Sequence, residues 1–487
     1  MPPSQNNNPN QSRVLFATPE CAPLVKTGGL GDVSAALPAA LYALGIDIRV
    51  LMPGYAAVKE ADPKAAELAQ FTVLGHKVRL LDSKLPSGVP LIVVDAPELY
   101  ERLGGPYQQD SGDDWPDNAM RFGVLSLVAA ILGTEMSPLP WRPNVVHCND
   151  WPTALAPLLL RYATHPHSAC LITVHNLAFQ GVFPYSETEK LQLPDGSLGV
   201  EGLEFYGKVS FLKGGLVYAD AINTVSPTYA REIQTPEVGF GLDGVLRARA
   251  NDLLGILNGI DTALWNPETD PWIPSRYGAA SLDKKAANKR ALKERLGLAG
   301  PDDVPLAAIV SRLTHQKGID LIVDALPHLA RIPVQVAIVG SGEQALVEHI
   351  REAQQRHPGH LASFIGFDEG LAHLVEAGAD MFLMPSRYEP CGMNQMYSQR
   401  YGTPPIANAT GGLVDTIVDD GADAATGFLL RELSVKGLVA AVERAVAAHR
   451  DPTHWARLQQ HGMARDFGWD RAALAYADIY ARIRSTS

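Results

Sequence analysis

Near its amino terminus the chain reads Pro19-Glu20-Cys21-Ala22-Pro23-Leu24-Val25-Lys26-Thr27-Gly28-Gly29-Leu30-Gly31-Asp32. The apolar run before this stretch, residues 14–17, predicts a strand, and the run after it, residues 33–44, predicts a helix. We therefore expect the loop at the carboxyl end of the strand, the edge where open α/β sheets bind ligands. Gly28 and Gly29 would let backbone N–H groups approach an anion, and Lys26 would add a full positive charge. The alternative is a tight turn that carries a surface lysine.

Length and composition indicate a globular protein of two domains. At 487 residues the chain is too long for one ordinary core, and 46% of its residues are hydrophobic while 19% are charged. The longest apolar run, residues 124–132, is too short to cross a membrane, so no membrane partner is expected. Residues 1–12 are rich in Asn, Pro and Gln without an apolar segment, which predicts a disordered tail rather than a signal peptide.

The charge and the cysteines narrow the possible partners and the compartment. A net charge of −12 argues against a nucleic-acid partner, which needs a basic footprint. It is compatible with a phosphorylated small substrate held by a few local cations. The four cysteines, at positions 21, 148, 170 and 391, are scattered and form no C-x-x-C pair. We therefore expect neither a disulfide framework nor a structural zinc site, and a reducing cytoplasm fits.

Short β-rich runs alternate with helical runs along almost the whole chain, which predicts an α/β fold with parallel sheets. The strands expected in the first half are 14–18, 46–52, 91–95, 145–147, 171–174, 221–225 and 255–257, with an added hairpin strand at 70–81. The strands expected in the second half are 306–310, 334–339, 362–365, 381–384 and 405–407. The main expected helices are 32–44, 118–132, 153–161, 284–296, 435–448, 453–461 and 471–484.

Residues 258–274 are rich in Pro and Asp and are typical of a hinge or linker. They separate two βα series, so the simplest prediction is two consecutive Rossmann-like domains, residues 13–262 and 263–470. Two such domains would face each other across a deep cleft, and the strong polar motifs should then follow strands in both halves.

Two such motifs lie in the first half. Asp150 follows the expected strand 145–147, where its carboxylate could contact a substrate or cap the next helix. His175 and Asn176 follow the strand 171–174. A single histidine is more often structural, but at the carboxyl end of a strand it is also placed to bond a sugar hydroxyl or a phosphate.

Three further motifs lie in the second half. Arg312 and Lys317 share the loop after strand 306–310, where two cations could hold a diphosphate or form a solvated basic loop. Glu389 follows strand 381–384 and precedes Cys391 and Gly392; it could bind sugar hydroxyls and balance positive charge at a reacting carbon, or cap the next helix.

The third motif repeats the pattern of the opening stretch. Thr410-Gly411-Gly412 follows strand 405–407 and opens a helix, as Thr27-Gly28-Gly29 does in the first half. Two helix amino termini at one cleft would suit a diphosphate leaving group. None of the motifs has the spacing of a metal site, and none is a Gly-x-Ser-x-Gly nucleophile elbow. We therefore expect no metal and no cofactor.

Taken together, these motifs resemble the bacterial glycogen synthases and plant starch synthases. The resemblance rests on the order of five motifs: Lys26-Thr27-Gly28-Gly29-Leu30, Thr173-Val174-His175-Asn176, Ser311-Arg312-Leu313 with Gln316-Lys317-Gly318, Pro385-Ser386-Arg387-Tyr388-Glu389-Pro390-Cys391-Gly392 and Thr410-Gly411-Gly412-Leu413. It implies a GT-B glycosyltransferase that moves glucose from ADP-glucose to the non-reducing end of an α-1,4-glucan such as glycogen, with retention of configuration and without a metal. The first domain would be the acceptor side and the second the donor side, with the last helix, residues 471–487, crossing back to the first.

The resemblance also assigns roles to single residues. It implies catalytic roles for Lys26, His175, Arg312, Lys317 and Glu389. It implies substrate binding by Gly28, Gly29, Asp150, Asn176, Phe367, Cys391, Gly392, Thr410, Gly411 and Gly412. Within these sets Arg312 and Lys317 would hold the diphosphate, Glu389 would support an oxocarbenium-like transition state, and Phe367 would stack on the adenine.

Some positions depart from the family pattern. Phe367 stands where Tyr is frequent, so any hydroxyl contact is lost, and Tyr397 stands where many related enzymes carry a second glutamate. Asn149 replaces a frequent His, and Gly31 a usual Ala. Nothing in the residues excludes UDP-glucose as the donor. The other readings are a different GT-B enzyme, such as one using UDP-glucose, and a non-catalytic glucan-binding protein. The residues do not define an oligomeric state.

Overall fold

The computed structural model describes residues 12–484, so the expected tail lies outside the described residues except for Ser12. The chain forms two compact units. Unit 1 comprises the residues up to Asn258 together with those from Trp469, and unit 2 comprises Gly259–Gly468. Both boundaries fall a few residues before the expected positions 263 and 471.

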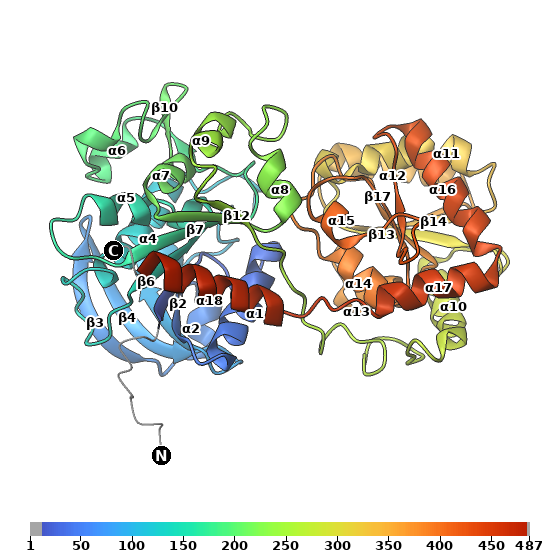
Figure 1. Cartoon of the computed structure of the whole chain (residues 1–487), viewed down its shortest axis with the longest axis horizontal. Helices are drawn as coiled ribbons and strands as arrows, with labels where there is room; N and C mark the ends of the chain where they lie inside the picture. Colours follow the sequence, from blue (N-terminus) through green and yellow to red (C-terminus); the bar gives the residue numbers. More distant parts are fainter. Residues whose placement is uncertain (1–11, 485–487) are drawn as a thin grey trace, which may run out of the picture. The chain divides into compact units, whose positions relative to one another are not determined.

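Unit 1 is built on a nine-stranded sheet with the order β12-β11-β7-β6-β1-β2-β5-β4-β3 (Figure 1). Its strands are β1 (Arg13–Ala17), β2 (Asp47–Pro53), β3 (Ala66–Val73), β4 (His76–Lys84), β5 (Pro90–Asp95), β6 (Val145–Asn149), β7 (Ala169–Val174), β11 (Ala221–Thr224) and β12 (Leu253–Gly255). The strands from β12 to β5 run parallel, whereas β4 and β3 add antiparallel at one edge. The strand order reverses between β1 and β6, which makes their carboxyl ends the switch point where such sheets bind ligands.

The helices of unit 1 cover this sheet, and a small second sheet lies beside it. The helices are α1 (Gly29–Ala43), α2 (Ala56–Ala61), α3 (Pro97–Tyr100), α4 (Asn118–Leu132), α5 (Leu155–Arg161), α6 (Glu187–Lys190), α7 (Phe211–Tyr218), α8 (Pro227–Glu232), α9 (Asp243–Ala248) and α18 (Asp470–Arg484). The small antiparallel sheet has the order β8 (Val182–Phe183), β10 (Lys208–Ser210), β9 (Glu204–Phe205). Its strands have two or three residues, too few for a periodicity that the sequence could reveal.

The last helix, α18, returns to unit 1 and packs beside α1 (Figure 1). A buried polar network fixes it to the large sheet. His147 on β6 bonds the hydroxyl of Tyr480 at 2.7 Å, and Asn223 on β11 donates to the hydroxyl of Tyr476 at 2.8 Å. Thr173 on β7 bonds His147 at 2.6 Å and donates to Asn223 at 2.5 Å. The two contacts with α18 are thus joined in one continuous chain of hydrogen bonds inside the core. Buried polar groups that all have partners fix one arrangement of a core.

Unit 2 has a six-stranded parallel sheet with the order β15-β14-β13-β16-β17-β18. The strands are β13 (Leu306–Val310), β14 (Gln335–Gly340), β15 (Leu361–Ile365), β16 (Met381–Met384), β17 (Pro405–Ala407) and β18 (Phe428–Leu429). In chain order this is 3-2-1-4-5-6, the Rossmann arrangement, with its switch point between β13 and β16. The helices are α10 (Lys285–Leu296), α11 (Ile319–Leu329), α12 (Gln344–Arg356), α13 (Glu369–Gly378), α14 (Asn394–Arg400), α15 (Gly411–Thr416), α16 (Val435–His449) and α17 (Pro452–Met463).

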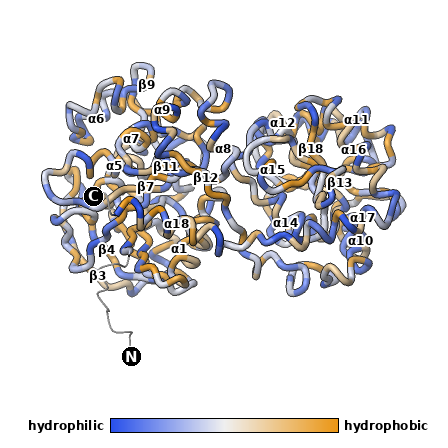
Figure 2. The backbone as a smooth tube through the Cα atoms, viewed as in Figure 1, coloured by the Kyte–Doolittle hydropathy of each residue, from blue (hydrophilic) through white to orange (hydrophobic). Residues whose placement is uncertain are grey.

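The core of unit 2 has two layers because successive strand residues point to opposite faces. On β13, Ala307 and Ile309 belong to one buried cluster, whereas Leu306 and Ala308 belong to the other. Buried on both sides, the strands are almost wholly apolar, and Figure 2 shows hydrophobic residues concentrated on the strands inside each unit. The expected parallel α/β organisation of both halves is confirmed.

The expected hinge at 258–274 is a linker only at its start. Trp265 stacks between His373 and Tyr397, with ring centroids 3.9 Å apart on each side. Asp270 is buried and bonds His373 at 2.7 Å and the hydroxyl of Tyr401 at 2.6 Å. This stretch is therefore part of the packed body of unit 2. Tyr397, in the position of a second glutamate, has a packing role here.

No helix within residues 12–484 is long and apolar enough to span a membrane.

Candidate functional site

Three loops of unit 1 follow neighbouring parallel strands, so they meet at one edge of the sheet. They follow β1, β6 and β7, and they carry Lys26 with its glycines, Asp150, and His175 with Asn176. The first two loops flank the switch point between β1 and β6. The sequence-predicted residues of the first half therefore gather at the edge where this topology predicts a ligand.

Glu20 organises the first of these loops, a role that the sequence motifs did not reveal. Its buried carboxylate accepts hydrogen bonds from the backbone N–H of Thr27 at 2.7 Å and of Gly28 at 3.3 Å. The hydroxyl groups of Thr27 and Tyr107 donate to it at 2.9 and 3.0 Å. Burial raises the pKa of Glu20, and the hydrogen bonds act against that rise. The N–H group of Gly28, which the sequence placed facing an external anion, is thus used by an internal carboxylate.

Lys26 remains exposed beside the start of α1. Its ammonium group pairs with Asp32 at 2.8 Å. The helix begins at Gly29 with Gly28 as an extended N-cap, three residues earlier than the sequence predicts. Glycine is a poor helix former, which explains why the pattern missed this first turn. Gly31 therefore lies inside α1 and not in the turn.

Asp150 and Asn149 hold the loop that carries His175. Asp150 Oδ1 accepts the backbone N–H of His175 at 2.7 Å, and Asn149 Oδ1 bonds His175 Nε2 at 2.9 Å. Asn149 in turn donates to the carbonyl of Ala17 at 3.0 Å. Asp150 makes no helix-capping bond, and it has the left-handed φ of 55°. The capping alternative is wrong, because this carboxylate serves the neighbouring strand.

The imidazole of His175 is electrically neutral in this setting. Burial lowers its pKa below the usual range. Because the amide nitrogen of Asn149 already donates to a carbonyl, its oxygen must accept, so His175 Nε2 carries the proton. The ring then presents Nδ1 as an acceptor, which can receive a hydrogen bond from a hydroxyl group.

Asp150 gives unit 1 a testable pH dependence. Burial raises its pKa to about 7, above the roughly 3.9 of an unfolded aspartate. Its contribution to folding is complete below the lower value and is lost as pH rises through 7. Asp150→Asn keeps an oxygen acceptor and cannot ionise. We expect the variant to be more stable at pH 8 than at pH 5 relative to the unsubstituted chain, that is, the difference in free energy of unfolding (variant minus unsubstituted) should be larger at pH 8. Urea unfolding at both pH values measures this; an equal difference at both would contradict the prediction.

In unit 2 the loops after β13 and β16 carry an ion pair between two predicted residues. Lys317 Nζ lies 2.6 Å from Glu389 Oε2, with only 17% and 6% of the two side chains exposed. Ser386 donates to the same carboxylate oxygen at 2.9 Å. Lys317 is therefore not part of a solvated loop. Glu389 does not cap a helix either, because α14 begins at Asn394 with Met393 at its cap.

Glycines let the loops of unit 2 pack backbone against backbone. A Cβ on Gly318 would lie 2.1 Å from the carbonyl oxygen of Pro385, and one on Gly411 would lie 1.9 Å from that of Glu389. Both glycines have left-handed φ angles, 69° and 46°. Only glycine satisfies both conditions. Glu389 is thus held by direct contact with the glycine loop after β17.

This packing corrects part of the expectation for Thr410-Gly411-Gly412. The N–H of Gly412 donates to the carbonyl of Glu389 at 3.1 Å, and the N–H of Thr410 donates to that of Asn408 at 3.0 Å. These two groups are therefore not available to phosphates as the loop stands. The loop echoes Thr27-Gly28-Gly29 in sequence but not in backbone, since Gly28 is extended where Gly411 is left-handed.

The remaining predicted residues of unit 2 differ in their exposure. The guanidinium of Arg312 is exposed and makes no hydrogen bond or ion pair within residues 12–484. Phe367, after β15, is 81% exposed. Cys391 is buried, and Gly392 has a φ of 69°. Arg387 is structural, because both its terminal nitrogens bond Asp320, at 2.8 and 2.6 Å.

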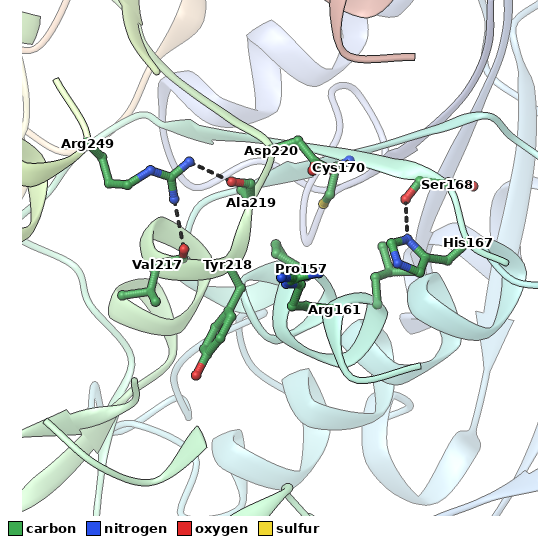
Figure 3. Close-up of a pocket in the computed structure, with 11 residues that line it drawn as sticks. Pro157, Arg161, His167, Ser168, Cys170, Val217, Tyr218, Ala219, Asp220 and Arg249 are labelled. Carbon is green, nitrogen blue, oxygen red and sulfur yellow. Dashed lines mark hydrogen bonds between the residues drawn. The ribbon is translucent and has the colours of Figure 1, made fainter. Parts of the chain in front are cut away.

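No group of three or more His, Cys, Asp or Glu side chains within residues 12–484 is arranged to hold a metal ion. A pocket of about 490 Å³ lies at the amino ends of β7 and β11, lined by residues that include Arg161, His167, Cys170, Tyr218 and Arg249 (Figure 3). It contains none of the predicted site residues, and Arg249 is occupied there by the carbonyls of Val217 and Ala219.

Comparison with known proteins assigns the family. Residues 13–248 match the model of the starch synthase catalytic domain, and residues 292–459 match that of glycosyl transferases group 1. A glycogen synthase of Aromatoleum aromaticum is 55% identical over 482 residues, which cover 98% of each chain. The chain belongs to the glycogen synthase family. Another glycogen synthase, of Nitrosomonas eutropha, is 50% identical over 480 residues, covering 96% of each chain. The expected resemblance is confirmed, and the chain is a glycosyltransferase.

Solved structures confirm the fold expected for a glycogen synthase. The catalytic domain of starch synthase IV from Arabidopsis thaliana, bound to ADP and acarbose, is 30% identical. The match covers 98% of this chain and 100% of that chain with a TM-score of 0.86. Sucrose-phosphate synthase from Thermosynechococcus elongatus, at 20% identity and a TM-score of 0.61, shares the fold. The GT-B fold class is therefore shown.

Proposed function

We propose that this chain transfers glucose from ADP-glucose to the non-reducing end of an α-1,4-glucan such as glycogen, with retention of configuration. The observation that carries the chemistry is the Lys317–Glu389 pair at the switch point of unit 2, with Arg312 on the same loop as Lys317. A cation and a buried carboxylate held together suit a reaction in which a diphosphate leaves and a sugar carbon becomes positive. The choice of donor is supported by the ADP bound to the Arabidopsis relative.

In this proposal each residue has a physical task. Arg312 is free to bind the diphosphate as a planar fork, and Lys317 neutralises the charge of the leaving nucleotide. Glu389, fixed by Ser386 and Lys317, binds glucose hydroxyls and stabilises positive charge at the anomeric carbon. The exposed ring of Phe367 stacks on the base of the nucleotide.

The loops of unit 1 serve the sugar and the acceptor. The neutral His175 accepts a hydrogen bond from a sugar hydroxyl through Nδ1, and Asn176 adds an amide beside it. Asp150 acts by positioning His175. Lys26, with Gly28 and Gly29, contributes its exposed charge to the substrates, and Cys391, Gly392 and the Thr410–Gly412 loop shape the donor site.

We further propose that the chain needs neither a metal nor a cofactor, because Arg312 and Lys317 supply the positive charge that the leaving group requires. A chelator should then leave the rate unchanged. We also infer a cytoplasmic enzyme without a nucleic-acid partner. Four reduced cysteines and a net charge of −12 support this inference.

Release of nucleoside diphosphate by the purified chain tests the function. Glycogen is supplied with ADP-glucose or with UDP-glucose, and release is followed with and without the glucan. We expect glycogen-dependent release from ADP-glucose. A preference for UDP-glucose would overturn the donor but not the reaction. No release from either, together with binding to glycogen, would identify a non-catalytic glucan-binding protein.

A further inference from the structure

Two aromatic residues of unit 1 stand in backbone conformations that aromatic residues rarely adopt. Tyr206 and Gly207 connect β9 and β10 as a two-residue hairpin, with φ angles of 49° and 77°. Positive φ at both positions is the type I′ turn, in which Asn-Gly is the usual pair. A bulky side chain is strained there. Tyr206 is nevertheless 80% exposed: its ring touches that of Phe205 edge-on, with the centroids 4.8 Å apart, and most of the side chain stays open to solvent.

The second aromatic residue repeats this pattern next to the first. Phe240 and Gly241 have φ angles of 48° and 82°, and Phe240 is 38% exposed. A Cβ on Gly241 would lie 3.2 Å from a ring carbon of Tyr206, so the two turns touch. We call Tyr206 and Phe240 the aromatic platform. Residues held in sparsely populated backbone conformations cluster at functional sites.

The platform is tied to the loop that carries His175. The buried side chain of Gln180 donates to the carbonyl of Phe240 at 3.0 Å and to that of Leu177 at 3.3 Å. Leu177 is two residues beyond His175. The hydroxyl of Ser210, at the end of β10, donates to the carbonyl of Gln180 at 3.1 Å. The platform is therefore a fixed extension of a predicted substrate loop.

The chemistry of the platform suits a neutral polysaccharide. The apolar C–H faces of glucose rings pack on aromatic rings, while their hydroxyl groups stay in water. Tyr and Phe offer large rigid surfaces at a low cost in side-chain entropy. We propose that the aromatic platform binds an α-1,4-glucan chain and so forms an acceptor subsite outside the reacting residues. This inference rests on the proposed function, because that function supplies the glucan.

Replacement of Tyr206 by asparagine is the decisive test. Asn is favoured at this turn position, so the variant should fold at least as well. We expect binding to glycogen, measured by affinity electrophoresis, to weaken about five- to tenfold, since an aromatic contact of this kind supplies that much. The KM for glycogen should rise by a similar factor, while the KM for the nucleotide sugar stays unchanged. Tyr206→Trp should retain binding.

Two further variants serve as a second test of the platform and as a control. Phe240→Asn also fits a left-handed position and should weaken glycogen binding in the same assay. Tyr42→Gln removes another half-exposed tyrosine of unit 1, on α1, and should change nothing. Unchanged glycogen affinity in Tyr206→Asn would overturn the platform, as would a change only in the self-association of the chain. If the unsubstituted chain binds glycogen but releases no nucleotide, the proposed function fails while the platform is still tested by binding.

Discussion

Replacement of Lys317 by alanine is expected to lower turnover by about 10²- to 10³-fold, the usual effect of removing one charged group that stabilises a developing negative charge. A smaller loss of stability is expected as well. Lys317 lies 2.6 Å from the nearly buried carboxylate of Glu389, which would lose its cation. An unpaired buried charge destabilises the fold, here by up to about 3 kcal/mol because Ser386 still donates to it.

A matched pair of variants separates catalysis from stability. Lys289 and Asp380 form another ion pair in unit 2, 2.7 Å long and with 8% and 16% of the side chains exposed. Lys289→Ala should lower the free energy of unfolding comparably and leave turnover per folded molecule intact. The double variant Lys317→Ala/Glu389→Gln should recover stability, because no charge remains, and stay inactive. Urea unfolding and nucleotide release measure the two quantities. Near-normal turnover in Lys317→Ala would refute the role of Lys317.

Replacement of Gly411 by alanine is expected to lower turnover by at least about 10²-fold. Its Cβ would lie 1.9 Å from the carbonyl oxygen of Glu389, so the loop that carries the carboxylate must move. The left-handed φ of 46° adds backbone strain. Together these effects should lower the free energy of unfolding by about 2–5 kcal/mol.

Gly297 provides the control for this experiment. It has a left-handed φ of 64° at the end of α10, but nothing lies within 4 Å of a Cβ placed there. Gly297→Ala should cost only the backbone strain, about 1–2 kcal/mol, and leave turnover unchanged. If both glycine variants lost activity equally, backbone strain and not the contact with Glu389 would explain the effect. Thermal unfolding and nucleotide release distinguish these outcomes.

Several elements have the bounds that the sequence predicts. The strands β13, β16 and β17 have the expected bounds, and α4 spans residues 118–132 as expected. The elements it missed are short. β18 has two residues, as do β8 and β9, and such segments show no period. The hairpin expected as one strand at 70–81 is two strands, because Leu74 and Gly75 turn with positive φ.

The candidate site shows the same division. That Asp150, His175, Lys317 and Glu389 follow strands could be predicted, because the end of an apolar run is a local signal. Their partners could not, since 72 residues separate Lys317 from Glu389 and 25 separate Asp150 from His175. The sequence does not show that the carboxylate of Glu20 binds the loop that carries Lys26, because that contact also depends on how the chain folds.

The sequence by itself determined the two βα series, the parallel sheets, the family and the strand ends at which polar residues gather. These follow from residue spacing and from short motifs, which act over a few positions along the chain. Only the tertiary structure decided that Glu389 is held by Lys317 and by the carbonyl contact with Gly411, that α18 closes unit 1 through Tyr480, and that Tyr206 stands exposed on a strained turn. Those features depend on which strands become neighbours in the sheets. The order of the strands is in turn set by the burial of both faces of each sheet, which involves residues far apart in the sequence.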